Sequence, residues 1–210
     1  MQIFKTPETV FEPDPIYDTL RFRDASGALK KWDLAETHRR VLELELENSV
    51  PEEIRSYFNS IRNLLLYSYY HYGFVAISAF LATTGVEMAL RTKYPWKNEN
   101  HKEGIPDNRP FAALFQRAVG DGNIREEEFL WLPETRRKDR ELWEEYARAI
   151  GAEPVFENAP YPPRLAKSTV RLRNYFAHQA DVHVLFTFEM AISTMRPCVD
   201  VINQLFRARK

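Results

Sequence analysis

Residues 171–178, Arg-Leu-Arg-Asn-Tyr-Phe-Ala-His, place guanidinium groups, an amide and an imidazole on a segment that is otherwise apolar. An imidazole accepts or gives a proton near neutral pH and a guanidinium stabilises charge on a phosphate, so this set suits acid–base chemistry beside a phosphate. At about 3.6 residues per turn, Asn174 and His178 lie on one helical face, with Arg171 near the same stripe. Arg173 would point roughly 140° away from His178, so these two side chains meet only if the helix ends or distorts near the histidine.

The run from Arg173 to His178 resembles the signature of the HEPN superfamily. Its members are all-helical domains marked by an arginine, a polar residue directly after it and a histidine four to six positions beyond the arginine. Asn174 is the polar residue, which favours Arg173 as the motif arginine, although Arg171 also fits the looser spacing. An apolar helix upstream (77–93) and an amphipathic helix downstream (183–207) follow the family's order.

The resemblance implies a metal-independent endoribonuclease that acts on single-stranded RNA and needs no cofactor. In that interpretation His178 is the general base or acid for a ribose 2′-hydroxyl, Arg173 binds the phosphate, and Asn174 orients the reacting groups. Arg171 is the alternative to Arg173, and the product is a 2′,3′-cyclic phosphate. Family members pair as homodimers in which two motif copies face one cleft, and bacterial stress or defence systems are their commonest setting.

A second interpretation is a non-catalytic HEPN-like module that binds RNA, a regulatory protein or another scaffold partner, because a fold does not imply an activity. Arg171 and Arg173 would then only form ion pairs, and His178 would cap or fill a helix end. One departure from the family bears on regulation. Members silenced by nucleotidyl transfer carry a tyrosine two residues after the histidine, where this chain has Ala180, so an antitoxin of that kind is not expected.

Charged residues outside the motif supply three further candidates. Glu87 is isolated on an apolar helix, and we expect it either to pair with a motif arginine as a supporting residue or to reach solvent near the helix end. Arg136 and Arg137 belong to a basic cluster at the start of a helix, where positive charge opposes the helix dipole unless an anion lies nearby. They are candidates for RNA binding, and the alternative is an ordinary solvated surface.

Composition narrows the classes of function. The formal net charge of −1 gives no global attraction for nucleic acid, so phosphate binding would have to come from a local patch. Cys198 is the only cysteine, which excludes an intramolecular disulfide and a multi-cysteine zinc site and fits a reducing cytoplasm. His183 lies five residues beyond His178 with no third ligand nearby, so no metal site is predicted. The first residues lack the pattern of a secretion signal, and the expected location is cytoplasmic.

The predicted fold is mainly α-helical, partly because 7 glycines in 210 residues are few for all-β or Rossmann-like folds. We expect a HEPN-like up-and-down helical bundle over residues 51–210. An N-terminal part, 1–50, contributes an irregular arm, a small β-hairpin between Asp18 and Asp33, and a helix. The hairpin face that packs on the bundle would hold Leu20, Phe22 and Leu29.

Hydrophobic periodicity and capping signals place the individual helices. They are predicted at 34–47, from a Ser49–Glu52 capping box to about Tyr72, on to Tyr94, from Pro110 to Gly120, at 125–131, at 135–150, from near Arg164 to His178, and at 183–207 with a kink at Pro197. The helix at 135–150 carries Leu142, Trp143, Tyr146 and Ile150 on one side.

Residues 63–86 carry no formally charged side chain and are long enough to cross a bilayer. Their tyrosines are spread through the stretch, whereas a spanning helix concentrates tyrosine at its ends. We therefore expect a buried core helix and no membrane span.

Overall fold

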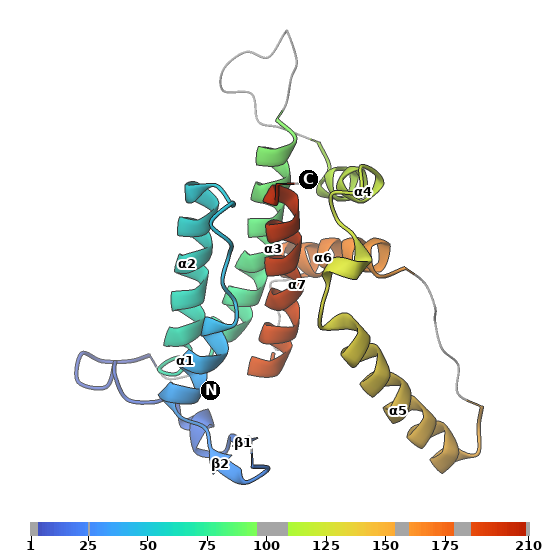
Figure 1. Ribbon diagram of the computed structural model, residues 1–210. Coiled ribbons are helices and arrows are strands. Elements are labelled where there is room, and N and C mark those ends of the chain that lie inside the picture. Colours follow the sequence, from blue (N-terminus) through green and yellow to red (C-terminus); the bar gives the residue numbers. More distant parts are fainter. Residues whose placement is uncertain (1–3, 25, 96–108, 154–159, 179–185, 209–210) are drawn as a thin grey trace.

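The computed structural model describes residues 4–24, 26–95, 109–153, 160–178 and 186–208, with the side chains of 175–178 outside the description (Figure 1). In chain order the elements are η1 (Pro15–Asp18), β1 (Arg21–Arg23), β2 (Leu29–Lys31), α1 (Leu34–Leu42), α2 (Glu52–Tyr67), α3 (Phe74–Lys93), α4 (Phe111–Gly120), η2 (Glu126–Glu128), α5 (Leu132–Ile150), α6 (Tyr161–His178) and α7 (Phe188–Phe206). The predicted fold class, mainly α with a small N-terminal hairpin, is confirmed.

The centre of the molecule is α3, which packs along α7 on one side and α2 on the other (Figure 1). It is apolar nearly all round and buries residues on several faces, including Val75, Ala82 and Leu90. Because α2 must cover only one side of it, α2 is amphipathic, and its predicted inward residues Ile54, Phe58, Ile61 and Leu65 are all buried.

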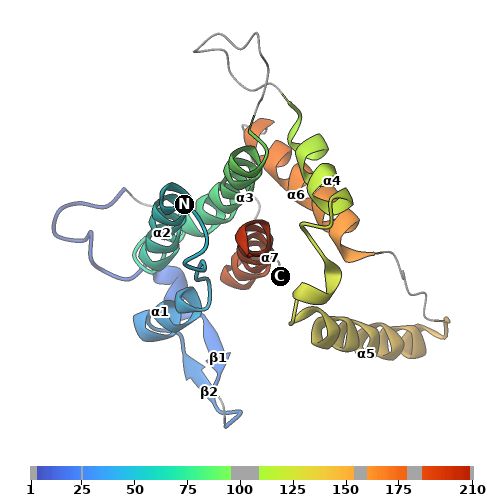
Figure 2. The ribbon, with the colours of Figure 1, turned by 45° about the horizontal axis from the view of Figure 1, so that its top comes forward.

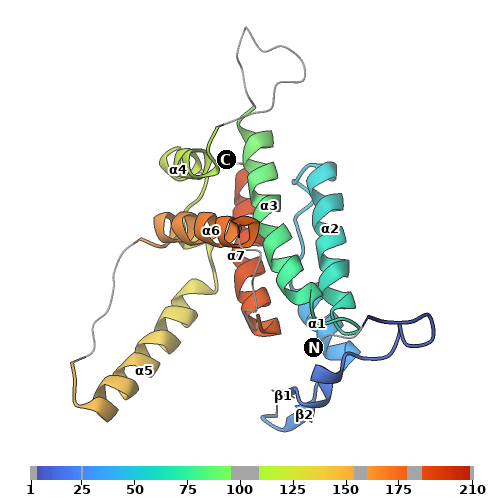
Figure 3. The same ribbon diagram turned by 180° about the vertical axis from the view of Figure 1, so that it is seen from behind.

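The ends of α3 and α7 lie together, so these two helices run in the same direction. At their starts the backbone N–H of Phe188 donates to the hydroxyl of Tyr72, and at their ends the Lys93 ammonium lies over the ring of Phe206. The antiparallel neighbour of α3 is α2, and α6 crosses α3 and α7 steeply (Figure 3). This crossing brings the end of α6 against the middle of the bundle.

The length and composition of α3 would also suit a membrane span, and among the described helices it is the one that meets this criterion. Half of its apolar stretch is buried inside the bundle, and a single such helix is weak evidence for a membrane span, because core helices of other proteins meet the same criterion. The expectation of no membrane span stays a prediction.

Several predicted helix boundaries are wrong. No side chain caps α2, which begins after Pro51 and ends at Tyr67, so the predicted Ser49 cap is absent. The start of α6 is Tyr161 and not Arg164. The start of α7 is Phe188, where Thr187 caps the helix, and the predicted start at residue 183 lies outside the described residues.

The hairpin is short and only partly follows its predicted packing. Arg21 to Arg23 pair antiparallel with Lys31 to Leu29, and Leu20 and Phe22 pack against the core. Leu29 is exposed, which contradicts its predicted inward position. The hairpin is instead held through Trp32, which is buried and stacks edge-on against Phe22 and Phe188.

Candidate functional site

The contact between α6 and α3 brings the motif arginine to the isolated glutamate. Nη2 of Arg173 lies 3.5 Å from Oε2 of Glu87, and the other oxygen of that carboxylate accepts a hydrogen bond of 2.6 Å from Arg91. The side chain of Glu87 is 15% exposed, whereas that of Arg173 is 35% exposed. A mostly buried carboxylate therefore holds two guanidinium groups, both of which are partly exposed.

This arrangement confirms the predicted pairing of Glu87 with a motif arginine and identifies Arg173 as the partner. The alternative, that Glu87 merely reaches solvent, is wrong. Arg171 is exposed, and among the described side chains it has no ion pair with Glu87. The two arginines of the motif thus have different surroundings, one held against α3 and the other turned to solvent.

Arg91 is a member of this cluster that the sequence interpretation missed. It follows Glu87 by one helical turn on α3, the spacing at which a glutamate and a following arginine pair across a helix surface. It also donates to the backbone carbonyl of Arg109, and Arg109 donates to that of Tyr94. Arg91 therefore links the carboxylate to the segment that precedes α4.

Asn174 and His178 complete the motif on α6. Asn174 is exposed, and its side-chain oxygen accepts a long hydrogen bond of 3.4 Å from Nη1 of Arg173. His178 is the last described residue of α6, and the residues that directly follow it lie outside the description. The side chain of His178 lies outside the described residues, and its predicted role stays a prediction.

Arg136 and Arg137 are neutralised by carboxylates. Arg136 pairs with Glu126 at 2.5 Å, and Arg137 bridges Glu134 and Glu141 at 2.7 and 2.5 Å. The anions that the helix dipole calls for are thus supplied by the chain itself. This pairing favours the solvated-surface alternative over an RNA-binding patch.

Glu126 has a second function, because its other oxygen accepts the backbone N–H of Tyr161 at 2.6 Å. That N–H opens α6 and has no partner inside the helix. The hydrogen bond from Tyr161 and the guanidinium of Arg136 hold the pKa of the Glu126 carboxyl below its ordinary value. Arg136 therefore serves the start of α6, about 18 Å of helix away from Arg173, and the two do not form one site.

Two hollows of the described part of the chain lie away from the motif, since neither is lined by Arg171, Arg173 or Asn174. The larger, about 730 Å³, lies between η2 and the start of α5, beside Arg136 and Arg137. The smaller, about 270 Å³, lies between the hairpin, α1 and the start of α7. The described side chains of the motif therefore lie outside both of these hollows.

No family model matches the chain, and no match was found among curated proteins or solved structures. Within the described residues no group of three or more histidine, cysteine, aspartate or glutamate side chains could hold a metal ion. His183 lies outside them.

Proposed function

We propose that the chain is a HEPN-like endoribonuclease that cleaves single-stranded RNA without a metal ion, at a site completed by two copies of the chain. The observation that carries the proposal is the state of Arg173, which is held by Glu87 yet one third exposed. A guanidinium has five N–H donors; in Arg173, Nη2 lies beside Glu87 and Nη1 donates to Asn174. The remaining donors suit a phosphate that approaches from solvent.

The proposed reaction is an internal transesterification. His178 takes the proton from a ribose 2′-hydroxyl, the 2′-oxygen attacks the adjacent phosphorus, and the bond to the 5′-oxygen of the next nucleotide breaks. That oxygen leaves with a proton from a general acid, which in a paired site is the second copy's histidine. Arg173 stabilises the charge that builds on the phosphate oxygens, and the products are a 2′,3′-cyclic phosphate and a 5′-hydroxyl.

Fixing the arginine is useful for this chemistry. A long, flexible side chain loses rotamer entropy when it binds a phosphate, and the carboxylate of Glu87 removes part of that cost in advance. Arg171 and Asn174 are exposed on the same helix and would contact the flanking ribose and phosphate groups. We therefore assign Glu87 a positioning role and Arg173 the phosphate contact.

The test is incubation of the purified protein with end-labelled single-stranded RNA in the presence of EDTA. We expect cleavage that leaves 2′,3′-cyclic phosphate ends, a loss of about 100-fold or more for His178→Ala, and a comparable loss for Arg173→Ala. His38→Ala is the matched control, because His38 is exposed on α1 and outside the motif. Uncut RNA with the native protein, or full activity of His178→Ala, would refute the proposal.

The pairing of Arg173, Arg136 and Arg137 with carboxylates favours one second candidate, a non-catalytic module that binds RNA or a regulatory protein. On that proposal the Glu87–Arg173 pair only fastens α6 to α3. RNA would then stay intact, and Arg173→Ala would lower the stability of the protein without changing any catalytic rate.

A further inference from the structure

The helix α5 exposes an apolar stripe that the rest of the described chain does not cover. Leu142, Trp143, Tyr146 and Ile150 are each more than half exposed, at 64, 55, 54 and 58%. All three views of the ribbon show α5 projecting from the bundle (Figure 2). The sequence predicts these residues on one side of a helix, and the structure leaves that side facing outward.

The stripe is large enough to mark an interaction surface. A large aromatic side chain buries about 150–250 Å² when covered, so four side chains that are half exposed present roughly 400 Å² of apolar surface. The largest apolar patch of a single chain is commonly of this size and is often functional. Doubled across two chains, roughly 800 Å² is less than a stable interface buries and suits weak association that is reversible and depends on concentration.

The charges along α5 select the partner. The half before Glu141 is mostly basic, and the half from Glu141 onward is mostly acidic. The basic side chains of the first half are Arg136, Arg137, Lys138 and Arg140, and the acidic ones of the second half are Glu141, Glu144 and Glu145. A second α5 laid antiparallel would place each basic half beside an acidic half, whereas a parallel one would place like charges together.

The spacing of the apolar residues also fits an antiparallel pair and defines which residues of the two α5 helices face each other. An antiparallel pair with its two-fold axis between Leu142 and Trp143 would place these two side chains against each other across the contact, and Tyr146 opposite Asp139 of the other copy. Lys138 and Glu145 lie on one flank of the stripe, each roughly 80–100° round the helix from Tyr146. In this register Lys138 of each copy lies on the same flank as Glu145 of the other, offset by two residues or about 3 Å along the helix axis, which a lysine side chain can span.

We propose that α5 is a homotypic interaction surface that pairs antiparallel with α5 of a second copy, with Leu142, Trp143, Tyr146 and Ile150 at its centre. In the single chain Lys138 is 3.3 Å from Glu134 of the preceding turn. That pair is exposed, so exchanging it for the intermolecular contact costs little. The surface lies apart from the contact of α6 with α3, so it does not depend on the proposed nuclease site.

Charge reversal in the full-length protein tests both the partner and its orientation. Lys138→Glu places two glutamates on the same flank of the antiparallel pair, and Glu145→Lys places two lysines there. Each variant alone should therefore dimerise at least 10-fold more weakly than the native chain in analytical ultracentrifugation. An equimolar mixture of the two should recover the native affinity, because both contacts in the mixed dimer then join opposite charges.

Glu144→Lys makes the same charge change on the opposite face of α5 and should leave the dimer unchanged. Trp143→Ser should abolish pairing, and circular dichroism will show whether each variant keeps its helices. A native chain that stays monomeric at 100 µM would overturn the proposal. Single variants that dimerise like the native chain, or a mixture that recovers nothing, would also overturn it and indicate that another segment or protein covers the stripe.

Discussion

Glu87 is the residue on which the motif surface depends, because it neutralises two guanidinium groups at once. Replacing it by glutamine keeps its size but leaves Arg91 and Arg173 facing each other without a carboxylate. Removing Arg173 leaves the carboxylate still paired with Arg91. The two substitutions are therefore unequal, although they break the same contact between α3 and α6.

We predict that Glu87→Gln lowers the free energy of unfolding by about 1–2 kcal/mol, since the cluster is only partly buried. Arg173→Gln should lower it by less than half of that amount. Urea unfolding followed by circular dichroism measures both values, with Arg171→Gln as the control for loss of an exposed arginine. A larger loss for Arg173→Gln than for Glu87→Gln would contradict this account of the cluster.

At the scale of single residues, the motif could be predicted from the sequence, and its surroundings could be predicted only in part. Glu87 could be identified because an isolated carboxylate on an apolar helix needs a cation. The polar residue after Arg173 favoured it as the motif arginine, but whether Arg171 or Arg173 pairs with Glu87 could not be predicted, because that depends on the angle at which α6 crosses α3. Arg91 could have been found from its spacing of four residues after Glu87, a local signal that needs no tertiary structure.

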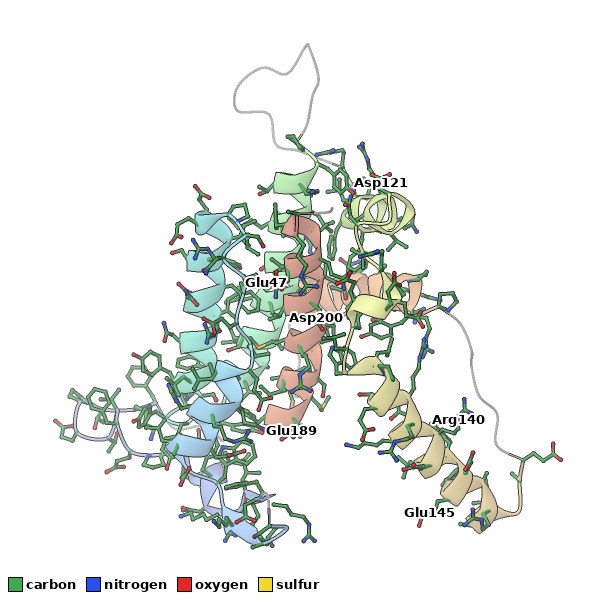
Figure 4. All side chains as sticks on the ribbon, in the orientation of Figure 1. Glu47, Asp121, Arg140, Glu145, Glu189 and Asp200 are labelled. Atoms are coloured by element: carbon green, nitrogen blue, oxygen red, sulfur yellow. The ribbon has the colours of Figure 1, made fainter. Side chains whose placement is uncertain are left out.

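Among the elements, α5 is fastened at its start by a contact with α7. The indole N–H of Trp131 donates to Oδ2 of Asp200 at 2.5 Å, and the ring of Trp131 stacks edge-on against Tyr161 at the start of α6. Figure 4 shows Asp200 on the side of α7 that faces this junction. Burial raises the pKa of the Asp200 carboxyl, and the hydrogen bond from Trp131 only partly opposes that rise.

This raised pKa gives a pH dependence of definite sign. The folded protein binds the proton on Asp200 more tightly than the unfolded chain does, so this group stabilises the fold as the pH falls and costs stability where it is ionised. We predict that Asp200→Asn, which can still accept from Trp131, is at least as stable as the native chain at pH 7. As the pH falls from 7 to 4, the free energy of unfolding of the native chain should rise relative to that of the variant.

Thermal unfolding across that pH range measures the difference between the two proteins. Trp131→Phe is the companion variant, since it removes the donor and leaves a half-buried carboxylate, at a cost of about 1–3 kcal/mol at pH 7. If the native chain loses stability relative to Asp200→Asn as the pH falls, the carboxyl is not held as the structure shows.

The sequence predicted the buried face of a helix correctly where that helix packs against a single neighbour. It did not predict a helix boundary that depends on residues far away in the chain. The inward face of α2 follows directly from its spacing. The start of α6 depends on Glu126, which lies 35 residues earlier and accepts the first N–H of the helix. The apolar side of α5 was predicted, but its exposure could not be, because periodicity reports an apolar face without reporting what covers it.

At the scale of the whole molecule, ion pairs and buried side chains join the N-terminal part to the last helix. Arg40 pairs with Glu189 at the start of α7, and Arg207 after its end pairs with Glu47 (Figure 4). Val50 lies in the same hydrophobic core as the residues of α2, α3 and α7. The described residues of the N-terminal part and of the bundle therefore share a hydrophobic core.

Tyr17 allows a test of the shared core, because it lies in the N-terminal arm and is fully buried. Its hydroxyl lies 3.1 Å from that of Ser68, and its ring packs against Tyr69 and Tyr72 between α2 and α3. We predict that Tyr17→Ala lowers the free energy of unfolding of the whole domain by about 3–5 kcal/mol in a single transition, since it opens a cavity against the bundle. Tyr17→Phe should cost about 1 kcal/mol.

Thermal unfolding followed through both helical circular dichroism and tryptophan fluorescence separates this expectation from local release of the arm. Trp96, Trp131 and Trp143 are replaced by phenylalanine in every protein compared, so that fluorescence reports on Trp32 in the N-terminal part. The far-ultraviolet signal reports on the helices, most of which follow residue 50. Phe4→Ala is the control, because Phe4 belongs to the same arm but is almost fully exposed. If the arm were a separate body, Tyr17→Ala would shift the fluorescence transition and leave the helical one in place. Coincident transitions that move together by the same amount are the outcome that a shared core requires.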